Sequence, residues 1–396
     1  MTRLLVHHVS ADFPDSIDGD KTKAIARLVE LAEPNFAQHV WSLNRRSPEL
    51  SNFAVKAVIS GLRPDCEIET EAFGRGSAII YRAPPRGIFH ACMLTDLGRK
   101  LAERIADGPR PDVLVGHKLT VEGLVVHEAA RLLDLPFALS IQGDTDTKIL
   151  GVRPDLRRRF AEAFHDAKVV FPFAPWSLER VEEQLGKRAG KTAILPCATD
   201  LDTSIAPRTD GTGLLSVFHL KSHRRKNLHG MVAAMRLLEA EGGAPRLDVI
   251  GGGSDTDRAA CERVIKRSGR IHFLGAMAGE DVRQCMNRAT ALVLPSLRES
   301  FGIVFIEALF AGCPVIYPKG CAVDGFFDGA AFAIPVDARD PTAIAAAMQR
   351  AVAEEIAMKA ELAEWQVSSE AVKFTRSVIG ASFVAGLQHA IAVRGS

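Results

Sequence analysis

Residues 294–316 read Leu-Pro-Ser-Leu-Arg-Glu-Ser-Phe-Gly-Ile-Val-Phe-Ile-Glu-Ala-Leu-Phe-Ala-Gly-Cys-Pro-Val-Ile, and this stretch decides the fold class. An apolar run at residues 291–294 has the length and composition of a buried strand. After Gly302 the apolar side chains recur at helical spacing, and Gly312 and Pro314 mark the end of that helix before a second apolar run. The order of strand, loop, helix and strand predicts a parallel α/β sheet.

The loop at residues 299–302 is therefore expected at the carboxyl end of a parallel strand and at a helix N-terminus. Ligands of open α/β sheets bind at such strand ends, and free N–H groups of a first helical turn attract anions. Glu299 and Glu307 would point about 80° apart if both were helical, so they share a ligand only if Glu299 is on the loop. Carboxylates repel a diphosphate, which leaves hydroxyls of a sugar or ribose as their partners. The alternative is a helix-capping Glu299 and a solvated Glu307.

The segment Glu-Ser-Phe-Gly, followed by Glu-Ala and then Ala-Gly-Cys-Pro-Val, resembles the E-x7-E motif of retaining GT-B glycosyltransferases of family 4. The resemblance implies that Glu299 binds hydroxyls of a donor sugar and that Glu307 binds the ribose of its nucleotide. It also implies that the backbone of Ser300, Phe301 and Gly302 faces the sugar and the phosphates.

A second cationic segment follows a predicted strand at residues 214–220. It contains Lys221 and Lys226-Asn227, and it resembles the Gly-Arg-x5-Lys-Asn segment of the same family, with Lys221 in place of the arginine. Two cations at a strand end can neutralise a diphosphate leaving group, although lysine lacks the bidentate fork of arginine. The alternative is a basic surface loop.

A glycine turn follows the next predicted strand, residues 246–250. We expect Gly252 and Gly253 to let the backbone approach a base or a ribose closely. The turn lacks the full G-x-G-x-x-G pattern and the acid at the following strand end, which argues against a dinucleotide-dependent oxidoreductase.

In the first half of the chain, His117 ends a predicted strand, and Gln142 ends the next one where the family often has a histidine. A histidine at that position could contact the donor or orient an acceptor hydroxyl, whereas a structural histidine is the alternative. Residues 194–200 resemble the last strand and turn of the family's first domain.

Composition sets wider limits on the function. The chain has 396 residues, is 47% hydrophobic and 24% charged, and carries a formal charge of +1, so it gives no global argument for nucleic-acid binding. Seven cysteines without a C-x-x-C pair argue against a disulfide framework and a zinc site. The polar N-terminus and the lack of a long apolar run predict a cytoplasmic protein with no membrane span.

Two basic clusters admit two interpretations. They are either solvated helix faces or contacts with anionic lipid heads at the inner membrane surface, and they comprise Lys21, Lys23 and Arg27, and Arg153, Arg157, Arg158 and Arg159.

These observations predict an α/β protein of GT-B type with two doubly wound Rossmann-like domains facing across a cleft. We expect an acceptor-binding domain at residues 1–205, a nucleotide-sugar-binding domain at residues 206–370, and a C-terminal helix at residues 371–396 that crosses back to the first domain.

The expected reaction is the transfer of a hexosyl-type sugar from a UDP- or GDP-sugar to a hydroxyl acceptor, with retention, in polysaccharide or glycoconjugate biosynthesis. We expect no metal, because no D-x-D cluster lies where it could clamp a diphosphate, and no cofactor besides the donor. The acceptor could be a glycan, a lipid-linked molecule or a small metabolite. An epimerase or hydrolase acting on the donor, and a non-catalytic nucleotide-sugar-binding subunit, remain as alternatives.

Overall fold

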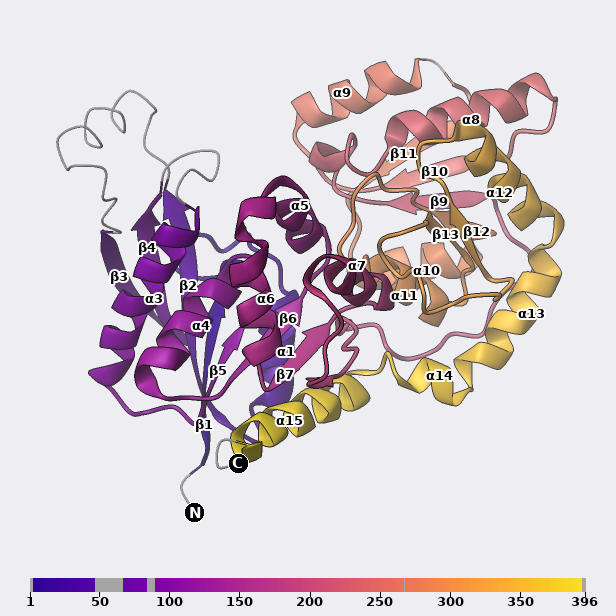
Figure 1. The fold of residues 1–396 in the computed structure, drawn as a ribbon. Helices are drawn as coiled ribbons and strands as arrows, with labels where there is room; N and C mark the ends of the chain where they lie inside the picture. Colours follow the sequence, from indigo (N-terminus) through magenta and orange to yellow (C-terminus); the bar gives the residue numbers. More distant parts are fainter. Residues whose placement is uncertain (1–2, 47–66, 84–89, 267, 394–396) are drawn as a thin grey trace. The chain divides into compact units, whose positions relative to one another are not determined.

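The computed structural model describes residues 3–46, 67–83, 90–266 and 268–393, and the chain forms two compact units (Figure 1). Unit 1 contains Met1–Phe173, Ser177–Ala198 and Ser377–Ser396. Unit 2 contains Ala174–Trp176 and Thr199–Arg376. The chain thus changes unit after residues 173, 176, 198 and 376, whereas the sequence predicted boundaries after residues 205 and 370.

Unit 1 is built on an eight-stranded sheet in the order β3-β4-β2-β1-β5-β6-β7-β8. All neighbouring strands are parallel except β3 and β4, which form an antiparallel pair at one edge. β1 lies inside the sheet, with β2 on one side and β5 on the other, so the strand order reverses between β1 and β5. The strands are β1 Leu5–Ser10, β2 Ala37–Arg46, β3 Ile68–Phe73, β4 Gly76–Arg82, β5 Val113–Gly116, β6 Phe137–Ile141, β7 Val169–Pro172 and β8 Lys191–Thr192.

The helices of this half include α1 Ala24–Ala32, α3 His90–Ala106, α4 Glu122–Leu133, α5 Asp144–Val152, α6 Arg157–Asp166 and α7 Pro175–Leu185. The C-terminal helix α15, Arg376–Ala392, belongs to the core of unit 1 and lies under its sheet in Figure 1. Phe383 contacts Phe171 with ring centroids 5.2 Å apart. A Cβ at Gly386 would lie 2.4 Å from the ring of Phe171, so this glycine allows the helix to approach the sheet.

Unit 2 is built on a six-stranded sheet in the order β11-β10-β9-β12-β13-β14, in which every neighbouring pair is parallel. The growth of the sheet reverses between β9 and β12, so their carboxyl ends form the switch point at which α/β sheets bind ligands. The strands are β9 Leu214–Val217, β10 Leu247–Ile250, β11 Ile271–Gly275, β12 Ala291–Val293, β13 Val315–Pro318 and β14 Ala333–Val336.

Helices cover both faces of this sheet. On one face α8 packs against α9 and α12, and on the other α10 packs against α11 (Figure 1). Their bounds are α8 Leu228–Ala240, α9 Asp255–Ile265, α10 Gly279–Arg288, α11 Ile303–Phe310, α12 Pro341–Ala353, α13 Glu355–Gln366 and α14 Ser369–Val372.

Two sequence expectations about secondary structure are wrong. No strand forms at residues 194–199, because the last strand of the first sheet is the two-residue β8. In place of the single C-terminal helix expected at residues 371–396, the described residues form α14 and α15, separated by a short turn. Helix α15 buries a single stripe of residues at helical spacing, which comprises Ile379, Gly380, Phe383, Val384, Gly386, Leu387 and Ala390.

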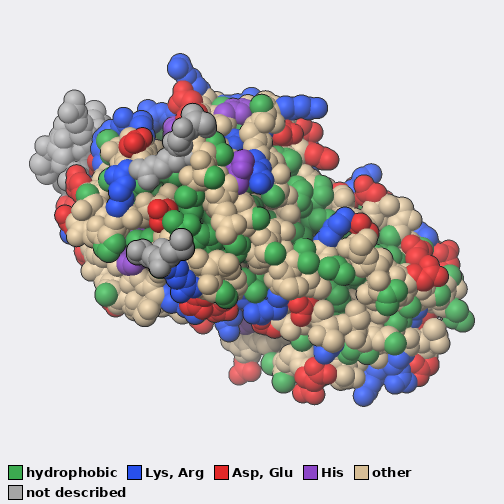
Figure 2. All heavy atoms as spheres, turned by 90° about the horizontal axis from the view of Figure 1, so that it is seen from below, with side chains coloured by type: hydrophobic (Ala, Val, Ile, Leu, Met, Phe, Trp, Pro, Cys, Tyr) green, Lys and Arg blue, Asp and Glu red, His purple; other side chains and the backbone are tan. Residues whose placement is uncertain are grey.

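The face drawn in Figure 2 has Lys and Arg side chains interspersed with Asp and Glu side chains, in agreement with the formal charge of +1. Within the part of the chain that the structure describes, no helix is long and apolar enough to span a membrane.

Candidate functional site

The residues predicted to bind a donor gather at the switch point of unit 2. Lys221 lies in η3, Leu220–Ser222, the short 3-10 helix that follows β9, and Lys226 ends the same loop. Glu299 lies in the loop after β12, the strand next to β9. The sheet topology therefore brings together residues that are far apart in the sequence.

The loop after β9 is fixed by two side chains that cap helices. His219 accepts a hydrogen bond from the N–H of Lys221 at 3.2 Å and so caps η3. Asn227 adopts the left-handed conformation, with φ of 62°, and its side chain accepts from the N–H of Gly230 at 3.1 Å. Asparagine tolerates this conformation better than most residues, which explains its place directly after Lys226.

Lys226 and Glu299 form an ion pair. Their side chains are only 13% and 10% exposed, so water screens the two charges poorly. The N–H of Leu297 donates to the carbonyl of Arg225 at 2.8 Å and fastens the two loops together. The arrangement places a cation that suits a phosphate beside an acid that suits hydroxyl groups.

Glu307 lies within α11 and Glu299 lies on the preceding loop, which is the condition for the two acids to share one ligand. Thr199 Oγ1 donates to Glu307 Oε1 at 2.8 Å and accepts from the N–H of Leu201 at 3.1 Å. Thr199 thereby holds one orientation of the carboxylate, and the sequence analysis missed this role.

Gly302 begins α11 with φ of 73°, and no side chain caps this helix N-terminus. A Cβ at this position would lie 2.7 Å from the ring of Phe305 and 3.2 Å from Cγ of Glu299, so only glycine fits without strain. The side chain of Phe301 is buried and contacts the ring of Phe326, with centroids 6.1 Å apart. Ser300, which directly precedes Phe301 in the chain, is half-buried.

The glycine turn after β10 packs against the loop after β9. A Cβ at Gly251 would lie 1.8 Å from the carbonyl oxygen of Phe218, and one at Gly253 would lie 2.9 Å from Cβ of Leu220. The N–H of Leu220 donates to the carbonyl of Gly252 at 2.8 Å. Close loop packing therefore accounts for Gly251 and Gly253, while contact of Gly252 and Gly253 with a nucleotide stays a prediction.

His117 lies in unit 1, directly after β5, and its side chain is fully buried. Its Nε2 is 3.1 Å from Nδ1 of His8, and the two rings stack with centroids 5.3 Å apart. Burial, together with the neighbouring His8 and Lys118, holds the pKa of His117 well below its usual value. The ring is therefore neutral and part of a packed pair, and its contact with a substrate stays a prediction.

A buried charge network that the sequence analysis missed lies at the switch point of unit 1. Lys118 pairs with Asp12 at 2.6 Å, next to the fully buried Glu122. Burial raises the pKa of Glu122 to about 7, although Lys118 opposes this shift. Asp146 accepts from the N–H of Thr120 at 2.9 Å and from its hydroxyl at 2.8 Å. Lys118 directly follows the predicted strand that ends at His117, which was the available signal.

No cluster of three His, Cys, Asp or Glu residues that could hold a metal ion occurs in residues 3–46, 67–83, 90–266 and 268–393. The oxygens of Asp146, the second acid of Asp144-Thr-Asp146, are occupied by hydrogen-bond donors.

The basic clusters are partly neutralised by acids. The side chain of Lys21 is almost buried and pairs with Asp15 at 2.8 Å, so Lys21 is not available to a membrane surface. In the second cluster Arg153 pairs with Asp155 at 2.7 Å. The interpretation of the first cluster as a solvated face or a lipid contact is therefore wrong for Lys21.

Residues 212–354, most of unit 2, match the family model described as glycosyl transferases group 1. This region is similar to the members of that family. The match contains Lys221, Lys226, Glu299 and Glu307. A curated relative, glycogen synthase of Mycobacterium tuberculosis, is 32% identical to this chain over 114 residues, or 28% of the chain. The alignment spans about a quarter (26%) of that relative's length.

Solved structures resemble the whole chain. Sucrose-phosphate synthase from Thermosynechococcus elongatus has a TM-score of 0.70 at 18% identity, covering 99% of this chain and 100% of that chain. An Anabaena protein in complex with UDP has a TM-score of 0.68 at 13% identity, covering 97% of this chain and 99% of that chain. These matches confirm the predicted GT-B fold class with its two Rossmann-like units.

Proposed function

We propose that the protein transfers a sugar from a nucleotide diphosphate sugar to a hydroxyl acceptor, with retention and without a metal ion. The observation that carries the proposal is the Lys226–Glu299 ion pair at the switch point of unit 2. The family match over residues 212–354 supports sugar transfer, and the UDP bound to the similar Anabaena protein supports a nucleotide donor.

The free site is balanced in charge, and the donor changes this balance. The diphosphate attracts Lys226 and Lys221, and the N-terminus of α11 adds partial positive charge. Glu299 then accepts hydrogen bonds from hydroxyls of the sugar in place of its ion pair with Lys226. Glu307, already oriented by Thr199, accepts a hydrogen bond from the ribose.

The reaction breaks the bond between the anomeric carbon and the phosphate oxygen. The acceptor hydroxyl attacks from the same face, and its proton passes to the departing phosphate. The two lysines stabilise the negative charge that develops on the diphosphate. Front-face attack needs no protein nucleophile, and it keeps the anomeric configuration.

The acceptor is proposed to bind in unit 1, where His117 and the Asp12–Lys118 pair lie at the switch point. A role in polysaccharide or glycoconjugate synthesis, and contact with an inner membrane surface, belong to the same proposal. Lys23, Arg157 and Arg159 are residues of the two clusters at which that contact can be tested.

The test begins with calorimetric titration of UDP, GDP and their glucose and mannose derivatives. Release of nucleotide diphosphate is then measured with and without a panel of sugar, sugar-phosphate and polyprenyl-phosphate acceptors. Proton NMR of the product establishes its anomeric configuration, and a chelator tests the need for a metal.

We expect acceptor-dependent release, a retained configuration and no effect of the chelator. Consumption of the donor without any acceptor would support an epimerase or hydrolase instead. Donor binding without turnover across the panel would support a binding subunit, and failure to bind any nucleotide would refute the proposal.

A further inference from the structure

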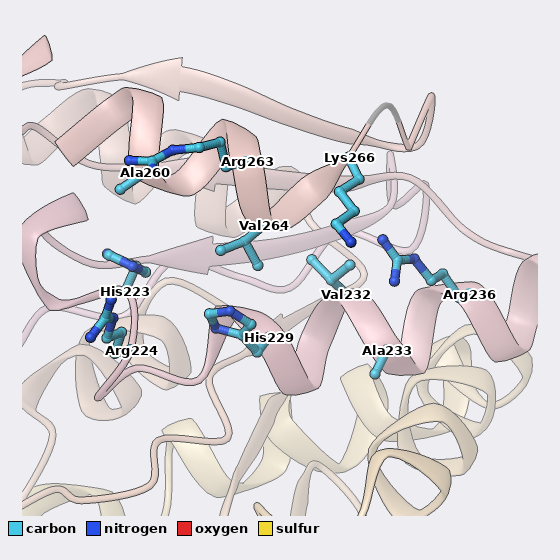
Figure 3. Close-up of a pocket in the computed structure, with 10 residues that line it drawn as sticks. All are labelled: His223, Arg224, His229, Val232, Ala233, Arg236, Ala260, Arg263, Val264 and Lys266. Atoms are coloured by element: carbon cyan, nitrogen blue, oxygen red, sulfur yellow. The ribbon is translucent and has the colours of Figure 1, made fainter. Parts of the chain in front are cut away.

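A groove separates α8 from α9 on the surface of unit 2 (Figure 3). Its volume is about 380 Å³, which is within the range of small-molecule sites. It is lined by His223, Arg224, His229, Val232, Ala233, Arg236, Ala260, Arg263, Val264 and Lys266.

The lining is cationic and contains no acid. Four of its ten residues are arginine or lysine and two are histidine. Arg263 Nε donates only to a backbone carbonyl, that of Ala259, at 3.2 Å. The nearby Glu262 pairs with Arg258, which does not line the groove, at 3.0 Å. Within the described chain, no ion pair neutralises the four cations of the groove.

Helix termini explain only part of this cluster. Lys266 caps the C-terminus of α9 and Arg263 lies in its last turn, where cations interact favourably with the helix dipole. Arg236 lies on α8 and Arg224 lies in the loop before it, so neither gains from the end of α9. Like charges brought together without counter-charges are unfavourable, and a bound anion would relieve this repulsion.

The cations lie at both ends of the groove. Figure 3 shows His223 and Arg224 at one end, Arg236 and Lys266 at the other, and His229 between them. The apolar lining residues are Val232, Ala233, Ala260 and Val264. This pattern suits a compact molecule that carries phosphate and has a less polar body.

We propose that this groove binds a small phosphate ester at a site separate from the donor site, and that the ligand changes donor affinity. The second part rests on the proposed function. Arg224 precedes Arg225, whose carbonyl accepts from Leu297 and fastens the loop that carries Glu299. His223 and Arg224 also lie between Lys221 and Lys226 in the chain. An anion that orders this segment acts on the Lys226–Glu299 pair, and the coupling is reciprocal.

Calorimetry measures the binding of two phosphate probes, glucose 6-phosphate and adenosine monophosphate. Glucose is the uncharged control. All of these titrations use a background protein that carries Glu307→Ala, which suppresses binding at the donor site. The double variant Arg236→Glu/Lys266→Glu changes exposed side chains and should weaken a phosphate probe at least about tenfold. Arg258→Ala on the outer side of α9 is the matched control, and it should leave the affinity within about twofold.

Equal affinity in the double variant and in the background protein would overturn the proposal. Binding to phosphatidylcholine vesicles containing phosphatidic acid, with no binding of the soluble probes, would also overturn it in favour of a lipid headgroup. UDP affinity is measured separately in protein with Glu307 intact. A failure of the groove to bind can thus be distinguished from a failure of the donor site to bind. We expect a saturating probe to change the UDP affinity only while Arg236 and Lys266 are intact.

Discussion

Thr199 and Glu307 are 108 residues apart in the sequence, yet the threonine hydroxyl donates to the carboxylate at 2.8 Å. Thr199 is fully buried and also accepts from the N–H of Leu201. The start of unit 2 therefore orients the acid that we assign to the ribose.

Replacing Thr199 with valine should raise the KM for the donor about tenfold or more while changing kcat little, because a hydrogen bond to a charged carboxylate contributes about 1.5–3 kcal/mol. Steady-state kinetics at saturating acceptor measure both constants. Thr199→Ser keeps the hydroxyl and serves as the control. An unchanged KM in Thr199→Val would separate this contact from donor binding.

Removing one partner of the Lys226–Glu299 pair should destabilise unit 2. Lys226→Met leaves Glu299 charged in a site with 10% exposure of its side chain, and we expect a loss on the order of 2 kcal/mol in the free energy of unfolding. Lys226→Met/Glu299→Gln should recover most of that loss but not activity. Urea denaturation and a turnover assay on the same samples test this contrast. A double variant as unstable as the single one would contradict it.

Lowering the pH below about 6.5 should destabilise unit 1. Burial lowers the pKa of His7 to about 3 and that of His8 to about 4, whereas both titrate near 6.5 when unfolded. Between these values the unfolded chain binds protons that the folded chain does not, so stability falls as the pH drops below 6.5. At about pH 5 each histidine that stays neutral should cost about 2 kcal/mol.

Urea titrations at neutral pH and near pH 5 measure this loss in the Glu122→Gln variant, because the raised pKa of Glu122 would otherwise stabilise the folded chain over the same pH range. Replacing His8 with glutamine removes one of these two titrating groups and should reduce the loss between the two pH values. Equal stability at the two pH values would show that the buried rings take up protons while folded.

Gly302→Ala should impair both folding and donor binding, because it forces a side chain into a backbone with φ of 73° and against the ring of Phe305. We expect a loss of about 1–3 kcal/mol in stability and a weaker affinity for UDP. Gly279→Ala is the matched control at another helix start, since a Cβ there meets nothing within 4 Å and should be tolerated. Thermal unfolding with and without UDP measures both effects.

Local sequence signals were sufficient for much of the fold. The strand predicted at residues 246–250 forms as β10 and the apolar run at residues 291–294 forms β12, because glycine or proline follows each apolar run closely. The short β8 could not be distinguished from a longer strand, since residues 194–198 are apolar and buried but follow an irregular path. Helix α13 was missed although its buried Met358, Leu362 and Trp365 recur at helical spacing.

The candidate site was predictable only in part. Motif spacing identified Lys226 and Glu299, but their direct pairing depends on β9 and β12 being neighbours in the sheet. The contact of Thr199 with Glu307 and the close approach of Gly251 to Phe218 also depend on which segments the fold places side by side. Contacts over such sequence distances follow from topology, which local patterns do not encode.

The ion pair at the centre of unit 2 also bears on molecular discrimination. A free nucleotide diphosphate could attract the lysine but would leave the acid without a cation, and a free sugar could engage the acid but would not attract the lysine. Only a molecule that joins both parts compensates both residues in one binding event. The intact donor should therefore be favoured over its own hydrolysis products, which would limit product inhibition as the reaction proceeds.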